Sequence, residues 1–136
     1  MKLNLESLAL SSKTAEFDFP GIPGFKVQLT YLSRMARRKL QEKCKVQKFD
    51  EHSGAPYMDI DTEKWRDEYA KHTITGWSGL TLNKVAQLML IDTDKVDNPD
   101  EEIEFDLDTA KQLLKLSDRF DSWVTLKLDQ LDNFRS

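Results

Sequence analysis

The sequence predicts a mainly α fold, of the α+β kind, with about four to five helices that follow an N-terminal β-hairpin. Apolar and polar residues alternate with a period of two between about residues 14 and 31, whereas helical spacing dominates after residue 33. The length of 136 residues suits one domain with one hydrophobic core. We therefore expect residues 1–136 to form a single domain.

The hairpin is the first predicted element. Residues 16–19 and 25–31 alternate apolar and polar side chains, as half-buried strands do. Between them, residues 20–24 read Pro-Gly-Ile-Pro-Gly, which favours a turn because proline fixes φ and glycine accepts positive φ. The register that matches apolar residues across the strands also places Asp18 opposite Lys26. A proline motif for partner binding is the less favoured interpretation of this segment.

Helical signals follow the hairpin. Ser33 is a suitable N-cap for a helix over residues 34–45, and Asp61 for a helix over residues 62–73. Between these helices, glycine and proline in residues 51–56 predict a loop.

The second half alternates between connections and helices. Residues 74–80, with a tryptophan between two glycines, predict a tight connection, after which Thr81 caps another helix. Residues 92–108 form an acidic loop whose end we expect to be extended against the core. Helical spacing resumes at Thr109 and is interrupted near Ser117. The predicted core includes Trp65, Tyr69, Trp77, Leu113, Leu114 and Val124.

The net charge of −4 conceals a strong asymmetry. Residues 1–48 contain ten Lys or Arg and four acids, a net of +6, which leaves ten bases and 20 acids, a net of −10, for the rest. Such a division indicates a partner, or a contact with the other end of the chain. The first ten residues lack the continuous apolar stretch of a secretory signal, and no stretch is long enough to span a bilayer. We expect a soluble, intracellular chain.

The sequence contains no set of residues with the types and spacing of a catalytic site. His52 lies in a predicted loop and His72 on an amphipathic helix, where a lone histidine is usually structural. Cys44 has helical spacing with Ala36 and Leu40, which indicates a small core residue rather than a nucleophile. We expect no catalytic residue, no metal and no cofactor.

The charged segments raise two binding functions, calcium binding and nucleic-acid binding. A calcium loop starting at Asp92 fails, because Val96 and Asp97 stand where an acid or amide and the turn glycine belong. The basic segment Arg34–Lys48 suits phosphate contacts, but it lacks interleaved aromatic residues and the chain is acidic overall, with a pI near 5.2. An acidic neighbour, within or between subunits, explains these bases better.

Several short segments carry a family resemblance through their order and spacing. They are the Phe-Pro-Gly entry to the hairpin with Phe25-Lys26-Val27, then Tyr31-Leu32-Ser33-Arg34, Ile74-Thr75-Gly76-Trp77-Ser78-Gly79-Leu80, Phe105-Asp106 with Ala110-Lys111-Gln112-Leu113-Leu114, Phe120-Asp121-Ser122-Trp123-Val124 and Leu131-Asp132-Asn133-Phe134. Together they cover most of the chain from about residue 15 onward. In this order the chain resembles the tail assembly chaperones of long-tailed bacteriophages.

The resemblance implies a mainly helical, non-enzymatic protein. Such chaperones bind the tape measure protein and keep its hydrophobic helices soluble until the tail tube polymerises around it. They often occur also in a longer form, made by a translational frameshift, whose extension recruits tail tube protein. The resemblance further implies self-association into a homo-oligomer, a location in the host cytoplasm, absence from the mature virion, and no nucleic-acid or membrane partner.

On this interpretation, two groups of residues are candidates for partner contact or self-association. We expect the basic residues Arg34, Arg37 and Arg38 to meet an acidic neighbour. We expect Phe120 and Trp123 to contribute to a contact surface, with ordinary core packing as the alternative. Two other functions stay open: a phage morphogenesis adaptor, as in head–tail joining, and a small nucleic-acid-binding regulator.

Overall fold

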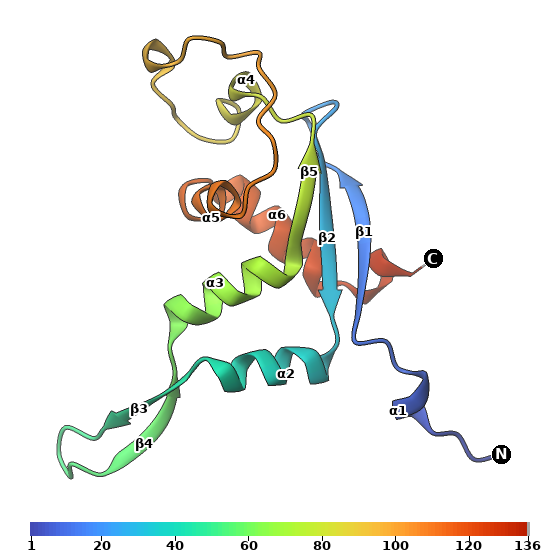
Figure 1. The fold of residues 1–136 in the computed structure, drawn as a ribbon, viewed down its shortest axis with the longest axis vertical. Coiled ribbons are helices and arrows are strands. Elements are labelled where there is room, and N and C mark those ends of the chain that lie inside the picture. The colour runs from blue at the N-terminus through green and yellow to red at the C-terminus, as the bar shows by residue number, and fades with distance from the viewer. Residues whose placement is uncertain (136) are drawn as a thin grey trace.

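The fold of residues 1–135, as described by a computed structural model, is α+β rather than mainly α. In these residues, five strands form two antiparallel sheets and six α-helices accompany them (Figure 1). The prediction of a mainly α fold is therefore wrong. The prediction contains no strand at residues 45–49 and 56–60, where it has only a helix end at residue 45 and a loop over residues 51–56, and it treats residues 74–80 as a connection, whereas β strands occupy 45–49, 56–60 and 74–78.

The first sheet contains the predicted N-terminal hairpin. Its strands are β1 (Ser12–Asp18), β2 (Lys26–Leu32) and β5 (Ile74–Ser78), in the order β1-β2-β5. The predicted register is confirmed, since Asp18 pairs with Lys26. β5 joins the far edge of β2, which makes the segment after the second long helix a strand.

One face of this sheet is buried and the other faces solvent, as is common for antiparallel sheets. On β2, Val27 and Leu29 are fully buried, whereas Lys26 and Gln28 are exposed. Thr30 lies on the same side of β2 as Lys26 and Gln28 but is buried, and its hydroxyl lies 2.7 Å from that of Thr14. The helices that cover the buried face complete the core.

The second sheet is a hairpin that projects from the body of the molecule. It consists of β3 (Lys45–Phe49) and β4 (Pro56–Ile60), and Figure 1 shows it extending beyond the ends of α2 and α3. The turn closes with a hydrogen bond from the Asp50 amide to the Ala55 carbonyl, 2.9 Å long. We call residues 45–60 the projecting hairpin.

Four longer helices and several short turns make up the helical part. They are α2 (Arg34–Lys43), α3 (Thr62–Thr73), α5 (Leu107–Leu116) and α6 (Asp118–Asp129), with short helices α1 (Leu5–Leu8) and α4 (Leu82–Val85) and 3-10 turns at Thr93–Lys95 and Leu131–Phe134. Each long helix begins at a side chain that accepts a backbone amide hydrogen bond: Ser33, Asp61, Asp106 and Ser117.

Four predictions about the helices can be compared directly with the structure. The helix over 62–73 is confirmed, and so is the interruption near Ser117. The helix expected over 34–45 ends at Lys43, because Cys44 caps it and β3 begins. The helix after Thr81 is only four residues long.

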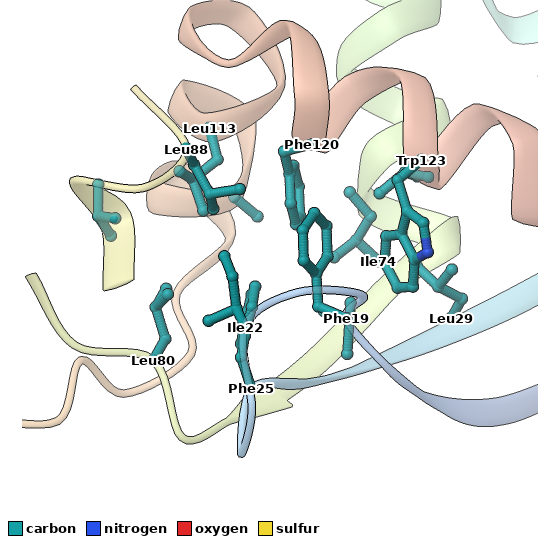
Figure 2. Close-up of a cluster of buried hydrophobic side chains, with 14 of the residues drawn as sticks. Phe19, Ile22, Phe25, Leu29, Ile74, Leu80, Leu88, Leu113, Phe120 and Trp123 are labelled. Carbon is teal, nitrogen blue, oxygen red and sulfur yellow. The ribbon is translucent and has the colours of Figure 1, made fainter. Parts of the chain in front are cut away.

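The core is built around aromatic rings from both ends of the chain. Phe19 lies 5.5 Å from Phe25, 6.2 Å from Phe120 and 4.7 Å from Trp123, measured between ring centroids. Figure 2 shows these rings from the hairpin turn facing those from α6. The N-terminal hairpin and the C-terminal helix therefore bury one another.

The acidic loop is tied to the segment after β5. The indole Nε1 of Trp77 donates to the Ile103 carbonyl at 2.9 Å, and the Ile103 amide donates to the Leu80 carbonyl at 2.7 Å. Ile103 and Phe105 pack against the core, and the Phe105 ring meets the Trp77 ring edge-on at 4.9 Å. The end of the loop is thus extended against the core.

Candidate interaction surfaces

The histidines and the cysteine lie in separate places. His52 is exposed in the turn of the projecting hairpin, whereas Nε2 of His72 lies 3.6 Å from the Glu68 carboxylate along α3. Cys44 is fully buried at the end of α2. Within residues 1–135, no group of three or more His, Cys, Asp or Glu side chains is placed to hold a metal ion.

The projecting hairpin carries one mainly apolar face. Directly paired residues lie on the same face of a two-stranded ribbon. The pairs Phe49–Pro56 and Gln47–Met58 thus share a face. Phe49 and Met58 are 63% and 60% exposed, so this face has no cover from the body of the protein.

The opposite face of the projecting hairpin is more polar. There the Lys48 ammonium lies 3.2 Å from the Asp59 carboxylate. A hydrogen bond from the Ile60 amide and the nearby Lys48 both lower the pKa of Asp59 below its ordinary value. Because an isolated two-stranded hairpin is marginal in water, these local contacts help to hold the ribbon in place.

A second uncovered apolar segment is the N-terminal arm, defined as residues 1–11. All of these residues are exposed, including four leucines between 61% and 71% exposed, namely Leu3, Leu5, Leu8 and Leu10. The arm contains α1, whose cap Asn4 accepts the Ser7 amide at 3.4 Å. It thus has local helical order without burying any of its leucines.

A groove lies between α3 on one side and α5 and α6 on the other. Its volume is about 730 Å³, and apolar residues such as Ile74, Val124 and Leu128 contribute to its lining. Trp65 and Tyr69 line it from α3, and their rings stack with centroids 5.1 Å apart. We call this feature the α3–α6 groove.

The α3–α6 groove carries charges of both signs along its sides. Four carboxylates line it, against three bases, which leaves a net charge of −1; these are Glu63, Asp67, Asp118 and Asp121 with Arg66, Lys111 and Lys115. One pair is close, since the Lys111 ammonium lies 4.0 Å from the Asp67 carboxylate. Burial raises the pKa of the Tyr69 phenol above its ordinary value of 10.0.

The basic and acidic segments of the sequence lie far apart in the structure. Arg34, Arg37 and Arg38 are exposed on α2, and within residues 1–135 no carboxylate lies within 4.0 Å of their guanidinium nitrogens. Figure 1 shows the acidic loop, after α4, at the opposite end of the long axis from α2. The basic helix and the acidic loop of one chain therefore do not meet each other.

The contact role expected for two aromatic residues requires correction. Phe120 is fully buried and Trp123 is 9% exposed, because both rings pack against Phe19 from the hairpin turn. Neither ring presents a surface to a partner in the folded chain.

The residues expected in the core divide into three groups. Leu113 and Val124 are buried within the core, and Tyr69, Trp77 and Leu114 pack against it while remaining partly exposed. Trp65 is partly exposed and stands at the α3–α6 groove. It lies outside the core, although its ring stacks on Tyr69, which does pack against the core.

Sequence reasoning missed the apolar surfaces of the projecting hairpin and the N-terminal arm. A signal for the hairpin was present, since two short runs containing Val, Phe, Tyr and Ile flank the Gly-Ala-Pro turn. For the arm, the signal was four leucines within ten residues.

Comparison with known proteins gives no assignment. The chain matches no family model, no curated protein and no solved structure. Within residues 1–135, no helix combines the length and the apolar character needed to cross a bilayer.

Proposed function

We propose that this protein is a non-enzymatic binding protein that acts during the assembly of a larger structure. More specifically, we propose a tail assembly chaperone of a long-tailed bacteriophage, which works in the host cytoplasm. It binds the tape measure protein and keeps it soluble while the tail tube forms. The ordered motifs that resemble this family support the specific proposal, and the exposed apolar surfaces support the general one.

The observation that carries the proposal is the apolar face of the projecting hairpin. Phe49 and Met58 are exposed to solvent on the projecting hairpin, which extends away from the rest of the molecule (Figure 1), and they do not belong to the core. Exposed apolar patches commonly mark protein interaction sites. An extended apolar client needs such a surface, because contact with it shields the client from water.

Self-association belongs to the same proposal. A single hairpin face offers a small contact area, so one copy holds a long client weakly. Copies arranged along the client gain avidity, because each further contact becomes intramolecular. In a head-to-tail arrangement, the exposed bases of α2 meet the acidic loop of the next copy, which suits an open or ring-shaped assembly.

The test is capture of tape measure fragments by co-expression. The double variant Phe49→Ser/Met58→Ser should lose most of the captured fragment, since it removes the apolar face without touching the core. The matched control Leu116→Ser/Leu126→Ser removes two leucines of similar exposure, 56% and 58%, from α5 and α6. Equal capture by the hairpin variant and the unaltered protein would exclude this face as the client site.

Gene context separates this function from a head–tail joining adaptor. A chaperone gene should lie between the genes for the tail tube and the tape measure protein. A slippery sequence near its end would supply the longer form that recruits tail tube protein. A gene placed among head completion genes would favour the adaptor.

One observation favours a second candidate, a nucleic-acid-binding regulator. The exposed arginines of α2 have no acidic partner within 4.0 Å among residues 1–135, and phosphates are an alternative ligand for them. Retardation of DNA that weakens steeply with salt, together with failure to capture tape measure fragments, would select the regulator.

A further inference from the structure

The two edges of the projecting hairpin present their backbone groups differently. In an antiparallel pair, residues that exchange hydrogen bonds alternate with residues whose N–H and C=O groups point away from the partner strand. At one end of the hairpin, the Asp50 amide donates to the Ala55 carbonyl at 2.9 Å. At the other end, the Asp61 amide donates to the Cys44 carbonyl at 2.8 Å. The odd-numbered residues of β3 and the even-numbered residues of β4 therefore direct their backbone groups outward.

The β4 edge is closed to a further strand. Of its outward residues, Pro56 has no amide hydrogen, and the Ile60 amide donates to the Asp59 carboxylate at 2.8 Å. Among the residues of β4, only Met58 keeps a free outward N–H. Proline and satisfied amides on an edge prevent the addition of strands there.

The β3 edge is open. Its outward groups belong to Lys45, Gln47 and Phe49, and within residues 1–135 none of these amides donates to a side chain as Ile60 does. All of β3 is exposed, and the hairpin extends away from the rest of the molecule (Figure 1). Such an edge binds an extended strand, because a strand spaces its own N–H and C=O groups to match.

We propose that β3 of one copy pairs with β3 of a second copy in antiparallel orientation, which joins two projecting hairpins into one four-stranded sheet. This inference deepens the self-association in the proposed function and rests on it. Because the β4 edge is closed, the addition of strands stops at two copies. The contact of α2 with the acidic loop then links such pairs into larger assemblies.

One register satisfies every outward group of β3. It places Gln47 opposite Gln47 of the second copy, on a two-fold axis, and Lys45 opposite Phe49. All outward residues of β3 then lie in hydrogen-bonded pairs. A slide by two residues brings Lys48 opposite Lys48 in one direction, and in the other it leaves Phe49 beyond the end of the partner strand. The symmetric register therefore fits best.

The charges of β3 permit pairing with an identical strand. The Lys45 ammonium lies 2.8 Å from the Glu42 carboxylate, and the Lys48 ammonium lies 3.2 Å from the Asp59 carboxylate. Both lysines of the strand are thus paired with acids of their own chain. Because these charges are balanced, β3 does not strongly repel a second β3.

A further charge pair favours a second copy as the occupant of the edge. The symmetric register carries Lys43, the last residue of α2, toward Glu51 in the hairpin turn of the other copy, and this contact occurs twice. Within residues 1–135, neither side chain has an ion pair within 4.0 Å. In one chain the five residues of β3 hold the two apart by roughly 17 Å. Each therefore finds its opposite charge only on another copy.

The joined sheet also enlarges the apolar face of the hairpin. Gln47 lies on the same face as Phe49 and Met58, and directly paired residues share a face. This face therefore continues from one copy into the other. Phe49 and Met58 of both copies lie on one surface, which offers a client twice the area of a single copy.

Proline substitution tests the edge. Gln47→Pro removes an outward amide hydrogen of β3 but no hydrogen bond within the hairpin, since Gln47 faces Met58 in a pair that exchanges none. We expect dimerisation to weaken at least about tenfold, measured by sedimentation in high salt that screens the α2 contact. Met58→Pro makes the same change on the closed edge and should dimerise normally. Equal weakening by both variants, or an unaltered protein that stays monomeric, would overturn the proposal.

Cysteine substitution tests the register without altering the backbone. Gln47→Cys places two thiols across the two-fold axis, at a Cα separation of about 5.5 Å that a disulfide spans. Under mild oxidation we expect a covalent dimer to form rapidly. Met58→Cys, exposed on the same face, should link far more slowly, and the unaltered protein should not link because Cys44 is fully buried. Equal linking by the two variants, or no linking of Gln47→Cys, would overturn the proposal.

Exchange of charge identifies the neighbour. Lys43→Glu and Glu51→Lys should each self-associate at least about threefold more weakly than the unaltered protein at low salt, because each dimer then places like charges together. An equal mixture of the two variants should form heterodimers of unaltered affinity, since both contacts regain opposite charges. A mixture that associates as weakly as the separate variants would contradict the proposed pairing.

Client capture distinguishes failure of this inference from failure of the proposed function. Gln47→Pro retains Phe49 and Met58, so it should still capture tape measure fragments, with lower avidity. If the cysteine link forms but no fragment is captured, the strand pairing stands and the chaperone function falls. If fragments are captured but no link forms, the pairing falls alone. Loss of capture by Gln47→Pro, when the unaltered protein is monomeric, would assign the β3 edge to an extended client segment instead.

Discussion

Gly79 approaches the backbone of Gly24 so closely that no side chain fits between them. A Cβ atom on Gly79 would lie 1.9 Å from the carbonyl oxygen of Gly24. Both residues have positive φ, +73° and +85°. This contact joins the turn of the N-terminal hairpin to the segment after β5, which carries the acidic loop.

Gly79→Ala should therefore be strongly destabilising. The clash involves backbone rather than a flexible side chain, so the sheet or the turn must move. We expect a loss of about 3 kcal/mol or more in the free energy of unfolding, measured by urea denaturation.

Gly54→Ala is the matched control for this substitution. Gly54 also has positive φ, +70°, but nothing lies within 4 Å of its Cβ position. Gly54→Ala should lower the free energy of unfolding only by the backbone strain of positive φ, about 1–2 kcal/mol. Equal losses for the two variants would show that positive φ, and not the approach to Gly24, sets the cost.

Ser117→Ala should separate the two roles of one buried hydroxyl. The Ser117 Oγ accepts the Phe120 amide at 3.1 Å, as the cap of α6, and donates to the Leu88 carbonyl at 2.9 Å. Its loss leaves both backbone groups without this partner in a buried site. We expect destabilisation of about 1–3 kcal/mol in thermal or chemical unfolding.

The control for the Ser117 variant is Ser122→Ala, at an exposed position on α6. It should change the free energy of unfolding by less than about 0.5 kcal/mol. A similar small effect at Ser117 would indicate that water replaces the lost hydroxyl.

Local signals in the sequence predicted some elements well and others poorly, for physical reasons. The N-terminal hairpin and α3 have strong local signals, namely matched alternation around a Pro-Gly turn and an aspartate cap. β5 was missed because only pairing with β2 makes a strand of a short segment with a central glycine. The projecting hairpin was missed because basic residues from the helix pattern continue into β3.

The surfaces were harder to predict than the elements. Whether an aromatic residue is buried depends on what packs over its helix face, and Phe120 faces the hairpin turn about 100 residues earlier. Likewise, periodicity cannot show that the leucines of the arm are exposed. The charge asymmetry was visible in the sequence, but only the fold places the two charges at opposite ends.

Stability should fall in alkaline solution through Tyr69. Burial raises its pKa in the folded chain above 10.0. Its contribution is therefore fully present below pH 10, and it is lost as the pH rises from 10.0 through the folded pKa. Unfolding measured from pH 8 to 12 should show a loss that Tyr69→Phe reduces.

Tyr57→Phe serves as the control for the alkaline titration, because Tyr57 is 47% exposed on the projecting hairpin. This variant should lose stability with pH as the unaltered protein does. Ultraviolet difference spectra should show the raised pKa of the Tyr69 phenol, and Tyr69→Phe should remove this late transition. If the late-titrating phenol persists in that variant, another tyrosine is responsible.

Reversing charge on α2 should weaken self-association. Arg37 and Arg38 are exposed, and the acidic loop they would meet belongs to another copy, because their own lies at the far end of the molecule. Arg37→Glu/Arg38→Glu places like charges against that loop. We expect the apparent dissociation constant, measured by sedimentation at low salt, to rise at least about tenfold, and the effect to shrink as salt screens the charges.

Lys26→Glu/Lys64→Glu changes the net charge equally at other exposed positions and should have a much smaller effect. Equal weakening by both variants would show that total charge, rather than the α2 surface, controls assembly.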